Sequence, residues 1–153
     1  MTKSKSSTKE LILIKSQRFN MSTRSYIGIL DNNTVKYVYC HWDGYPEYNG
    51  IILDKYYNNL NDAIKLVNGG DMSSLGTTVE KTSYYNDGNS TIVETVETFV
   101  NGNHGSIEWI YLFDTELDDW IVCETLLDKF TMDDFDTLKE ILAPIPESQK
   151  SNI

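Results

Sequence analysis

Histidine, cysteine and proline are scarce in this chain. Its 153 residues include two cysteines, two histidines and three prolines. Cys40 and Cys123 lie in separate apolar runs without the spacing of a zinc or disulfide-exchange motif, so we expect two buried, reduced thiols. His41 and His104 are too few for a three-histidine metal site. The sequence therefore predicts neither a bound metal nor another cofactor.

Catalytic signatures are missing as well. The chain contains no G-x-S-x-G elbow, no P-loop, no H-E-x-x-H pair and no dinucleotide-binding fingerprint. A cysteine nucleophile activated by histidine would need Cys123 beside His41. Cys40 precedes His41 in a strand and therefore points to the opposite face. We assign no catalytic residue, and the Cys123 pairing stays open.

Long apolar runs are missing too. No segment approaches the roughly 18 consecutive apolar residues of a membrane-spanning helix. The apolar run 11–14 is too brief for a signal-peptide core, and no small-residue cleavage site follows it. We therefore expect a soluble, cytoplasmic protein that does not engage a membrane.

Acidic residues, in contrast, are abundant and unevenly placed. The formal net charge is -10, and residues 108–147 hold twelve acidic residues against two lysines. A strong negative field repels nucleic acid and favours a partner protein with a basic surface. The alternative is an acidic surface that only keeps the protein in solution. The contact candidates in this region are Asp118, Asp119, Asp133 and Asp134.

Composition divides the chain into three parts. Residues 1–20 are rich in serine, threonine and lysine, which predicts a disordered or loosely packed extension. Residues 21–143 fit a single α+β domain that is long enough to bury a core. Pro144 and Pro146 end the last helical pattern, and we expect residues 144–153 to form a loose tail.

Three hairpins account for the expected sheet. They pair residues 25–30 with 34–42, 77–85 with 91–100, and 106–113 with 120–125. Residues 94–99 also fit a helix. Alternation in the first hairpin places Tyr39 and His41 on one face of the strand and Cys40 and Trp42 on the other. In the last hairpin it places Ile107 on the face of Trp109.

Capping residues mark the helices. Asn49 is placed to cap a helix over 50–57, and Asn61 or Asp62 to cap a second short helix that Gly69-Gly70 closes. Thr131 is placed to cap a C-terminal helix. The inward stripe of that helix is Phe135, Leu138, Ile141 and Leu142. The predicted fold class is α+β, an antiparallel sheet built from hairpins with two short helices after residue 49 and a C-terminal helix.

Between the first strands and the helices lies the densest group of aromatic, titratable and turn-forming residues, YCHWDGYPEYNG at 39–50. Gly44 tolerates positive φ and Pro46 ends the strand, so the chain turns here. Arg24 should lie near this turn, because the strand that begins beside Arg24 pairs antiparallel with the strand that leads into the turn. The candidate binding residues are Arg24, His41, Trp42, Asp43, Tyr45 and Glu47.

Three interpretations of this turn are open. His41, Asp43 and Glu47 could converge as a metal or acid–base site. Trp42 and Tyr45 suit protein recognition, because rigid aromatic side chains bury area at a small entropy cost. The structural alternative is an Asx-type turn at Asp43 whose aromatic side chains pack on the following helix.

The motif also carries a resemblance. Arg24-Ser25, the run HWDGYPE at 41–47, Gly50 and the run GDMSSL at 70–75 resemble small phage and bacterial proteins with an HWDGYP-type segment. The runs WIYLFD at 109–114 and WIV at 120–122 are similar to a hairpin of those proteins, and Tyr48-Asn49 departs from their pattern. The resemblance covers roughly residues 21–127 and implies a phage accessory protein.

Two functions follow as hypotheses. The first is a phage-type accessory protein that binds and inhibits a host protein, such as a defence nuclease, in the host cytoplasm and without catalysis of its own. The second is a small-molecule, nucleotide-like binding protein or enzyme that uses residues 41–47 with Arg24. A concave pocket at the turn would favour the second, and a convex acidic face the first.

Overall fold

A computed structural model describes residues 22–85, 90–125 and 129–153. The strands are β1 (Arg24–Asp31), β2 (Thr34–Cys40), β3 (Met72–Ser74), β4 (Ser83–Tyr84), β5 (Ile92–Thr95), β6 (Ile107–Asp114), β7 (Asp119–Glu124) and β8 (Asp136–Thr137). The helices are η1 (Pro46–Gly50), α2 (Ile51–Tyr56), α3 (Leu60–Asn68), α4 (Val96–Asn101), η2 (Met132–Asp134), α5 (Leu138–Leu142) and α6 (Glu147–Lys150). The α+β class is confirmed.

One mixed sheet organises the molecule. Its strand order is β4-β3-β2-β1-β6-β7-β8, and β5 pairs with β2 beside this path. Most neighbours are antiparallel, but the central pair β1–β6 is parallel, as is the short β2–β3 contact. The central parallel pair joins segments about 80 residues apart, which no hairpin can do. The sheet is therefore not built from hairpins alone.

The second expected hairpin is wrong in its pairing. β4 pairs with β3, and β5 pairs with β2 through Thr34↔Thr95 to Tyr37↔Ile92. Residues 77–82 form turns instead of a strand, and the expected strand 91–100 becomes β5 followed by α4. Residues 86–89, which would connect the two strands of this expected hairpin, lie outside the described residues.

A bulge corrects the expected face of Ile107. Arg24 pairs with Ile107, and the next residue, Ser25, pairs with Trp109, so Glu108 is the extra residue. One extra residue reverses the alternation before it. Ile107 consequently packs with Ile110 and not with Trp109.

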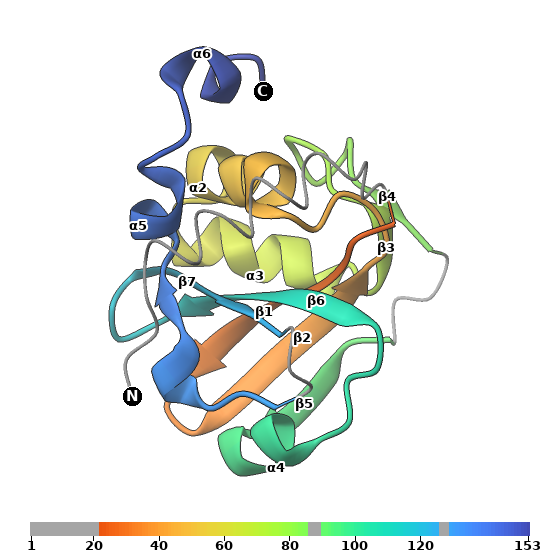
Figure 1. Ribbon diagram of the computed structural model, residues 1–153. Helices are drawn as coiled ribbons and strands as arrows, with labels where there is room; N and C mark the ends of the chain where they lie inside the picture. The colour runs from red at the N-terminus through yellow and green to blue at the C-terminus, as the bar shows by residue number, and fades with distance from the viewer. Residues whose placement is uncertain (1–21, 86–89, 126–128) are drawn as a thin grey trace.

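The two sheet faces bury different cores. The helix-covered face packs against α2, α3 and α5, and its largest side chains are Trp109, Tyr111, Phe113 and Trp120. We call the other face the open face; α4 and the segment 130–135 cover it, mainly through Phe99 and Phe130. Figure 1 shows α2 and α3 on one side of the sheet and α4 on the other.

The first two helical segments do not begin at the capping residues predicted from the sequence. A π-helical turn begins at Pro46 and continues into α2, so Asn49 lies inside a helix and is fully buried. Asn59 caps α3, because its Oδ1 accepts from the N–H of Asp62 at 2.9 Å. The close of α3 is as predicted, with Gly70 at φ 89° just beyond it.

The expected C-terminal helix is interrupted. Thr131 caps only the short η2, the chain then forms β8, and Thr137 caps α5. Phe135 therefore packs on the open face, while Leu138 belongs to the helix-covered core.

The chain beyond α5 has structure of its own. Ile145 is buried in the helix-covered core, α6 follows, and the Tyr56 hydroxyl donates to the carbonyl oxygen of Ile153 at 2.6 Å. The extension predicted for residues 1–20 lies outside the described residues. None of the helices in the described part of the chain has the length and apolar character needed to cross a bilayer.

Candidate functional site

The HWDGYP turn, residues 41–46, is held by its backbone. The Gly44 N–H donates to Thr23 O at 2.9 Å, and the Tyr111 hydroxyl donates to Gly44 O at 2.6 Å. The positive φ of the turn belongs to Asp43, at 58°, and not to Gly44. Glycine is needed at 44 for another reason: a Cβ there would lie 2.7 Å from Thr23 O and 2.8 Å from Ser25 Cβ.

The polar side chains of the turn and of the helical residues after it do not converge on one point. The Tyr45 hydroxyl donates to Asp43 Oδ1 at 3.1 Å, and burial raises the pKa of Asp43. Asn49 Nδ2 donates to Trp42 O at 3.3 Å, which ties the turn to the helix behind it. Glu47 is buried. Within the described residues, no three His, Cys, Asp or Glu side chains are grouped as metal ligands.

A polar chain connects β1, β2 and the turn. Arg24 Nε donates to the Tyr39 hydroxyl oxygen at 3.0 Å, and that hydroxyl lies 2.6 Å from His41 Nδ1. The Tyr39 hydroxyl takes part in both contacts and so links Arg24 to His41. The His41 ring in turn meets Trp42 edge-on, with centroids 4.4 Å apart. Arg24 thus lies near the turn, as its strand pairing predicts.

The two thiols lie on opposite faces of the sheet. Cys40 packs in the helix-covered core and Cys123 in the open-face core, both as free, buried cysteines. Burial raises the pKa of the Cys40 thiol to about 12. Cys40 is therefore a protonated core residue at neutral pH, without the thiolate that a nucleophile requires.

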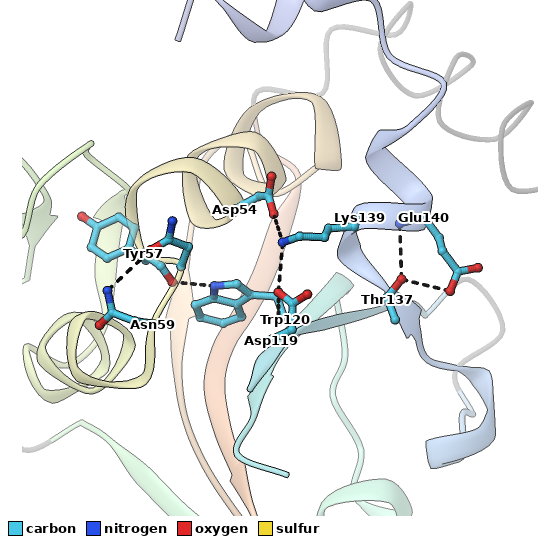
Figure 2. Close-up of polar contacts among 9 residues, drawn as sticks. Asp54, Tyr57, Asn59, Asp119, Trp120, Thr137, Lys139 and Glu140 are labelled. Atoms are coloured by element: carbon cyan, nitrogen blue, oxygen red, sulfur yellow. Dashed lines mark hydrogen bonds and ion pairs between the residues drawn. The ribbon is translucent and has the colours of Figure 1, made fainter. Parts of the chain in front are cut away.

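The four acidic candidates divide into two kinds. Asp119 binds Lys139 Nζ at 3.4 Å, and the same Nζ binds Asp54 at 3.0 Å; Figure 2 shows these contacts beside the Trp120–Tyr57 hydrogen bond. Asp134 Oδ2 accepts from the Thr131 N–H at 2.8 Å and caps η2. These two carboxylates have structural partners.

Asp118 and Asp133 differ from that pair. Both are exposed, and their carboxylates form no hydrogen bond or ion pair with residues 22–85, 90–125 or 129–153. Asp118 has φ 55° in the β6–β7 turn, so its position at the tip is set by the backbone. These two side chains are available to a partner.

An apolar hollow lies among these acidic segments. It has a volume of about 390 Å³ and lies at the N-terminal end of α4 on the open face. We call it the acidic hollow; its lining is Leu30, Asn32, Asn33, Val96, Asp114, Leu117, Ile121, Met132 and Phe135. Leu117 is 57% exposed, so its side chain is offered to solvent at the rim.

A second hollow lies past the C-terminal end of α4, and the sequence pattern does not indicate it. We call it the tyrosine hollow; it measures about 460 Å³ and is lined chiefly by Tyr26, Tyr37, Tyr39, Asp71, Ile92 and His104. The abundance of tyrosine, ten residues, was the one available signal. Alternation in β2 indicates that Tyr37 and Tyr39 share a face, but not that Tyr26 and His104 join them.

Two further hollows complete this group of four. One lies on the open face between Asn101 and Asp134, and one beside α2 and α3 between Tyr56 and Glu80. None of the four is lined by a residue of the HWDGYP turn. The polar chain reaches the tyrosine hollow only through Tyr39.

Comparison of the chain with protein-family models, curated proteins and solved structures finds no match.

Proposed function

We propose that this is a binding protein that engages a basic surface of a partner protein through the acidic hollow. One observation carries the proposal. Three segments meet around that apolar floor, 31–33, 114–119 and 131–136, and together they hold eight acidic residues and no lysine or arginine. An apolar centre with a charged rim is the usual anatomy of a protein interface.

The apolar floor and the acidic rim have separate roles in binding. Leu117, Met132 and Phe135 supply apolar area that a partner can remove from water, which contributes affinity. The acidic rim attracts a basic partner over distances up to about a Debye length and disfavours acidic ones. Asp118 and Asp133 contribute most directly, because they lack partners of their own among the described residues.

The finer part of the proposal is an inhibitor of a host protein, such as a defence nuclease, made by a phage. Its support is the resemblance of residues 41–47 to HWDGYP-type phage proteins. The acidic rim is compatible with such a target, because nucleases present basic surfaces to their substrates. The acidic hollow would occupy that surface in place of nucleic acid.

Affinity capture from bacterial lysate, with matched variants, tests the binding function. Asp118→Lys/Asp133→Lys reverses the two available rim charges. Glu80→Lys/Glu147→Lys makes the same change in net charge at two exposed positions that do not line the acidic hollow. We expect a basic protein to be captured by the native chain and by the Glu80/Glu147 variant, and lost from the Asp118/Asp133 variant.

Salt gives the second measurement. The amount of partner protein captured through the acidic rim should fall steeply between about 0.05 and 0.5 M NaCl, because salt screens the charges of the rim. A captured protein that is retained equally by both variants and in high salt would contradict the proposal. Absence of any captured basic protein would count against it as well.

A further inference from the structure

The tyrosine hollow brings three phenol rings together from two strands. Tyr26 comes from β1, and Tyr37 and Tyr39 come from one face of β2. The rings of Tyr26 and Tyr37 have centroids 4.7 Å apart and are tilted by 50°. A volume of about 460 Å³ lies in the range of small-ligand sites. The hollow is thus an aromatic-walled space open to solvent.

Two carboxylates lie beside these rings. Asp71 Oδ1 accepts from the Tyr39 N–H at 2.9 Å, and Oδ2 accepts no hydrogen bond from the described residues. Glu94 lies on β5 opposite Val35, beside Tyr37 on the same face of the sheet. Its Oε2 is buried and has no hydrogen-bond partner among the described residues. Negative charge therefore stands at the hollow with part of its hydrogen-bonding capacity unused.

The nearby basic groups do not cancel this charge. His104 Nε2 donates to Phe99 O at 2.6 Å, and its Nδ1 lies 3.0 Å from the Tyr26 hydroxyl, so both ring nitrogens are engaged within the protein. Arg24 brings one positive charge at the edge, through its bond to Tyr39. Two carboxylates against one guanidinium leave a net negative site.

The phenols themselves stay uncharged. Burial, then the charges of Glu94 and Asp71, raise the pKa of Tyr26. Burial and the charge of Glu94 likewise raise the pKa of Tyr37. Neutral tyrosine rings present the negative face of their π systems, which attracts cations.

We propose that the tyrosine hollow binds an organic cation of the alkylammonium or guanidinium class. Aromatic walls and adjacent carboxylates are the groups that recognise such ions. An anionic ligand such as a nucleotide is disfavoured, because Asp71 lines the hollow and Glu94 lies beside it on β5. The cation could be a free metabolite or a side chain of a partner protein. Only the second source rests on the proposed function.

An NMR titration of the 153-residue chain with choline tests the proposal. The control ligand is 3,3-dimethylbutan-1-ol, which has the same shape without the charge. We expect saturable shifts at Tyr26, Tyr37 and Ile92 with choline, and binding of the neutral alcohol at least about fivefold weaker. Equal affinity for the two, or no saturable shift with choline, would overturn the proposal.

Matched variants locate the effect. Glu94→Gln removes the charge and keeps the shape, and Glu97→Gln makes the same change on the exposed side of α4. We expect Glu94→Gln to weaken choline binding by roughly fivefold or more, and Glu97→Gln to leave it unchanged. Equal loss in both variants would reduce the effect to net charge and refute the site. Their fold is checked by amide spectra, so a folding defect is recognised.

A glycine-serine peptide with a single arginine separates the two sources of the cation. Binding of choline tighter than the peptide assigns the hollow to a free cation, and the reverse assigns it to a side chain of a partner. The Asp118→Lys/Asp133→Lys variant should bind both probes as the native chain does. Loss of partner capture with choline binding intact would therefore concern the acidic hollow alone.

Discussion

The two faces of the sheet share the same strands and differ in what covers them. On the helix-covered face, three helices pack on large aromatic side chains. Trp120 Nε1 there donates to Tyr57 O, 2.8 Å away (Figure 2), whereas the buried Trp109 Nε1 has no hydrogen-bond partner among the described residues. On the open face the cover is α4 and residues 130–135, and three of the four hollows lie there. We infer that the first face supplies stability and the second recognition.

Truncating one phenylalanine on each face should give the largest difference. Phe113→Ala leaves a cavity under three helices, and we expect it to lower the free energy of unfolding by about 4 kcal/mol. Phe130 belongs to the thin cover of the open face, which can collapse after truncation, so Phe130→Ala should cost about 2 kcal/mol. Urea denaturation measures both. Equal losses would mean that the two covers pack equally well.

Two glycines extend the comparison to the loops. Gly44→Ala places a Cβ against Thr23 O and should cost about 2–3 kcal/mol. Gly105, beside the tyrosine hollow, has φ 55° but open space around it, so Gly105→Ala should cost about 1 kcal/mol. Thermal melts of the two variants show which substitution lowers the stability more. A larger loss for Gly105→Ala than for Gly44→Ala would contradict the prediction.

Alkaline pH should weaken the helix-covered face through Cys40. Its pKa is raised to about 12 in the folded protein, from 9.0 in the unfolded chain. The protonated thiol is thus favoured by folding: this contribution is complete below pH 9 and is lost between pH 9 and 12. Over that window it should remove up to about 1.4 kcal/mol per pH unit.

Cys40→Ala serves as the control for this window. The variant should lose stability overall but show a shallower fall between pH 9 and 10.5 in urea midpoints. Identical slopes for the variant and the native chain would show that the thiol does not contribute.

Charge reversal on the rim of the acidic hollow should have the smallest effect on stability. Asp118→Lys/Asp133→Lys alters two exposed side chains without partners among the described residues, and we expect a change within about 0.5 kcal/mol. Urea denaturation at low salt measures it. A loss above about 2 kcal/mol would make these residues structural and weaken the case for a binding rim.

Local patterns in the sequence determined which core the residues of β2 face, whereas the bulge at Glu108 reversed the expected face of Ile107. Alternation separates Tyr37 and Tyr39 from Val38 and Cys40, and the structure buries them on opposite faces. The Gly69-Gly70 pair marks the end of α3. These features depend on side-chain period and backbone freedom, which a short segment specifies by itself.

Strand partners were decided by the tertiary structure. The sequence indicates β5 but not its place beside β2, and the parallel β1–β6 pairing has no local signal. A strand pattern reports that a face is buried, whereas the partner depends on which backbone edge is free after the rest has packed. β8 interrupts the last helical pattern for the same reason: its backbone pairs with β7.

The candidate sites divide in the same way. The sequence indicated the HWDGYP turn and the acidic segments, because their residue types are locally dense. It did not indicate that Asp43 would take the positive φ, or that residues 26, 71 and 104 would meet at one hollow. Those residues are far apart in the chain, and only the packing of β1, the segment before β3 and the loop after α4 brings them together.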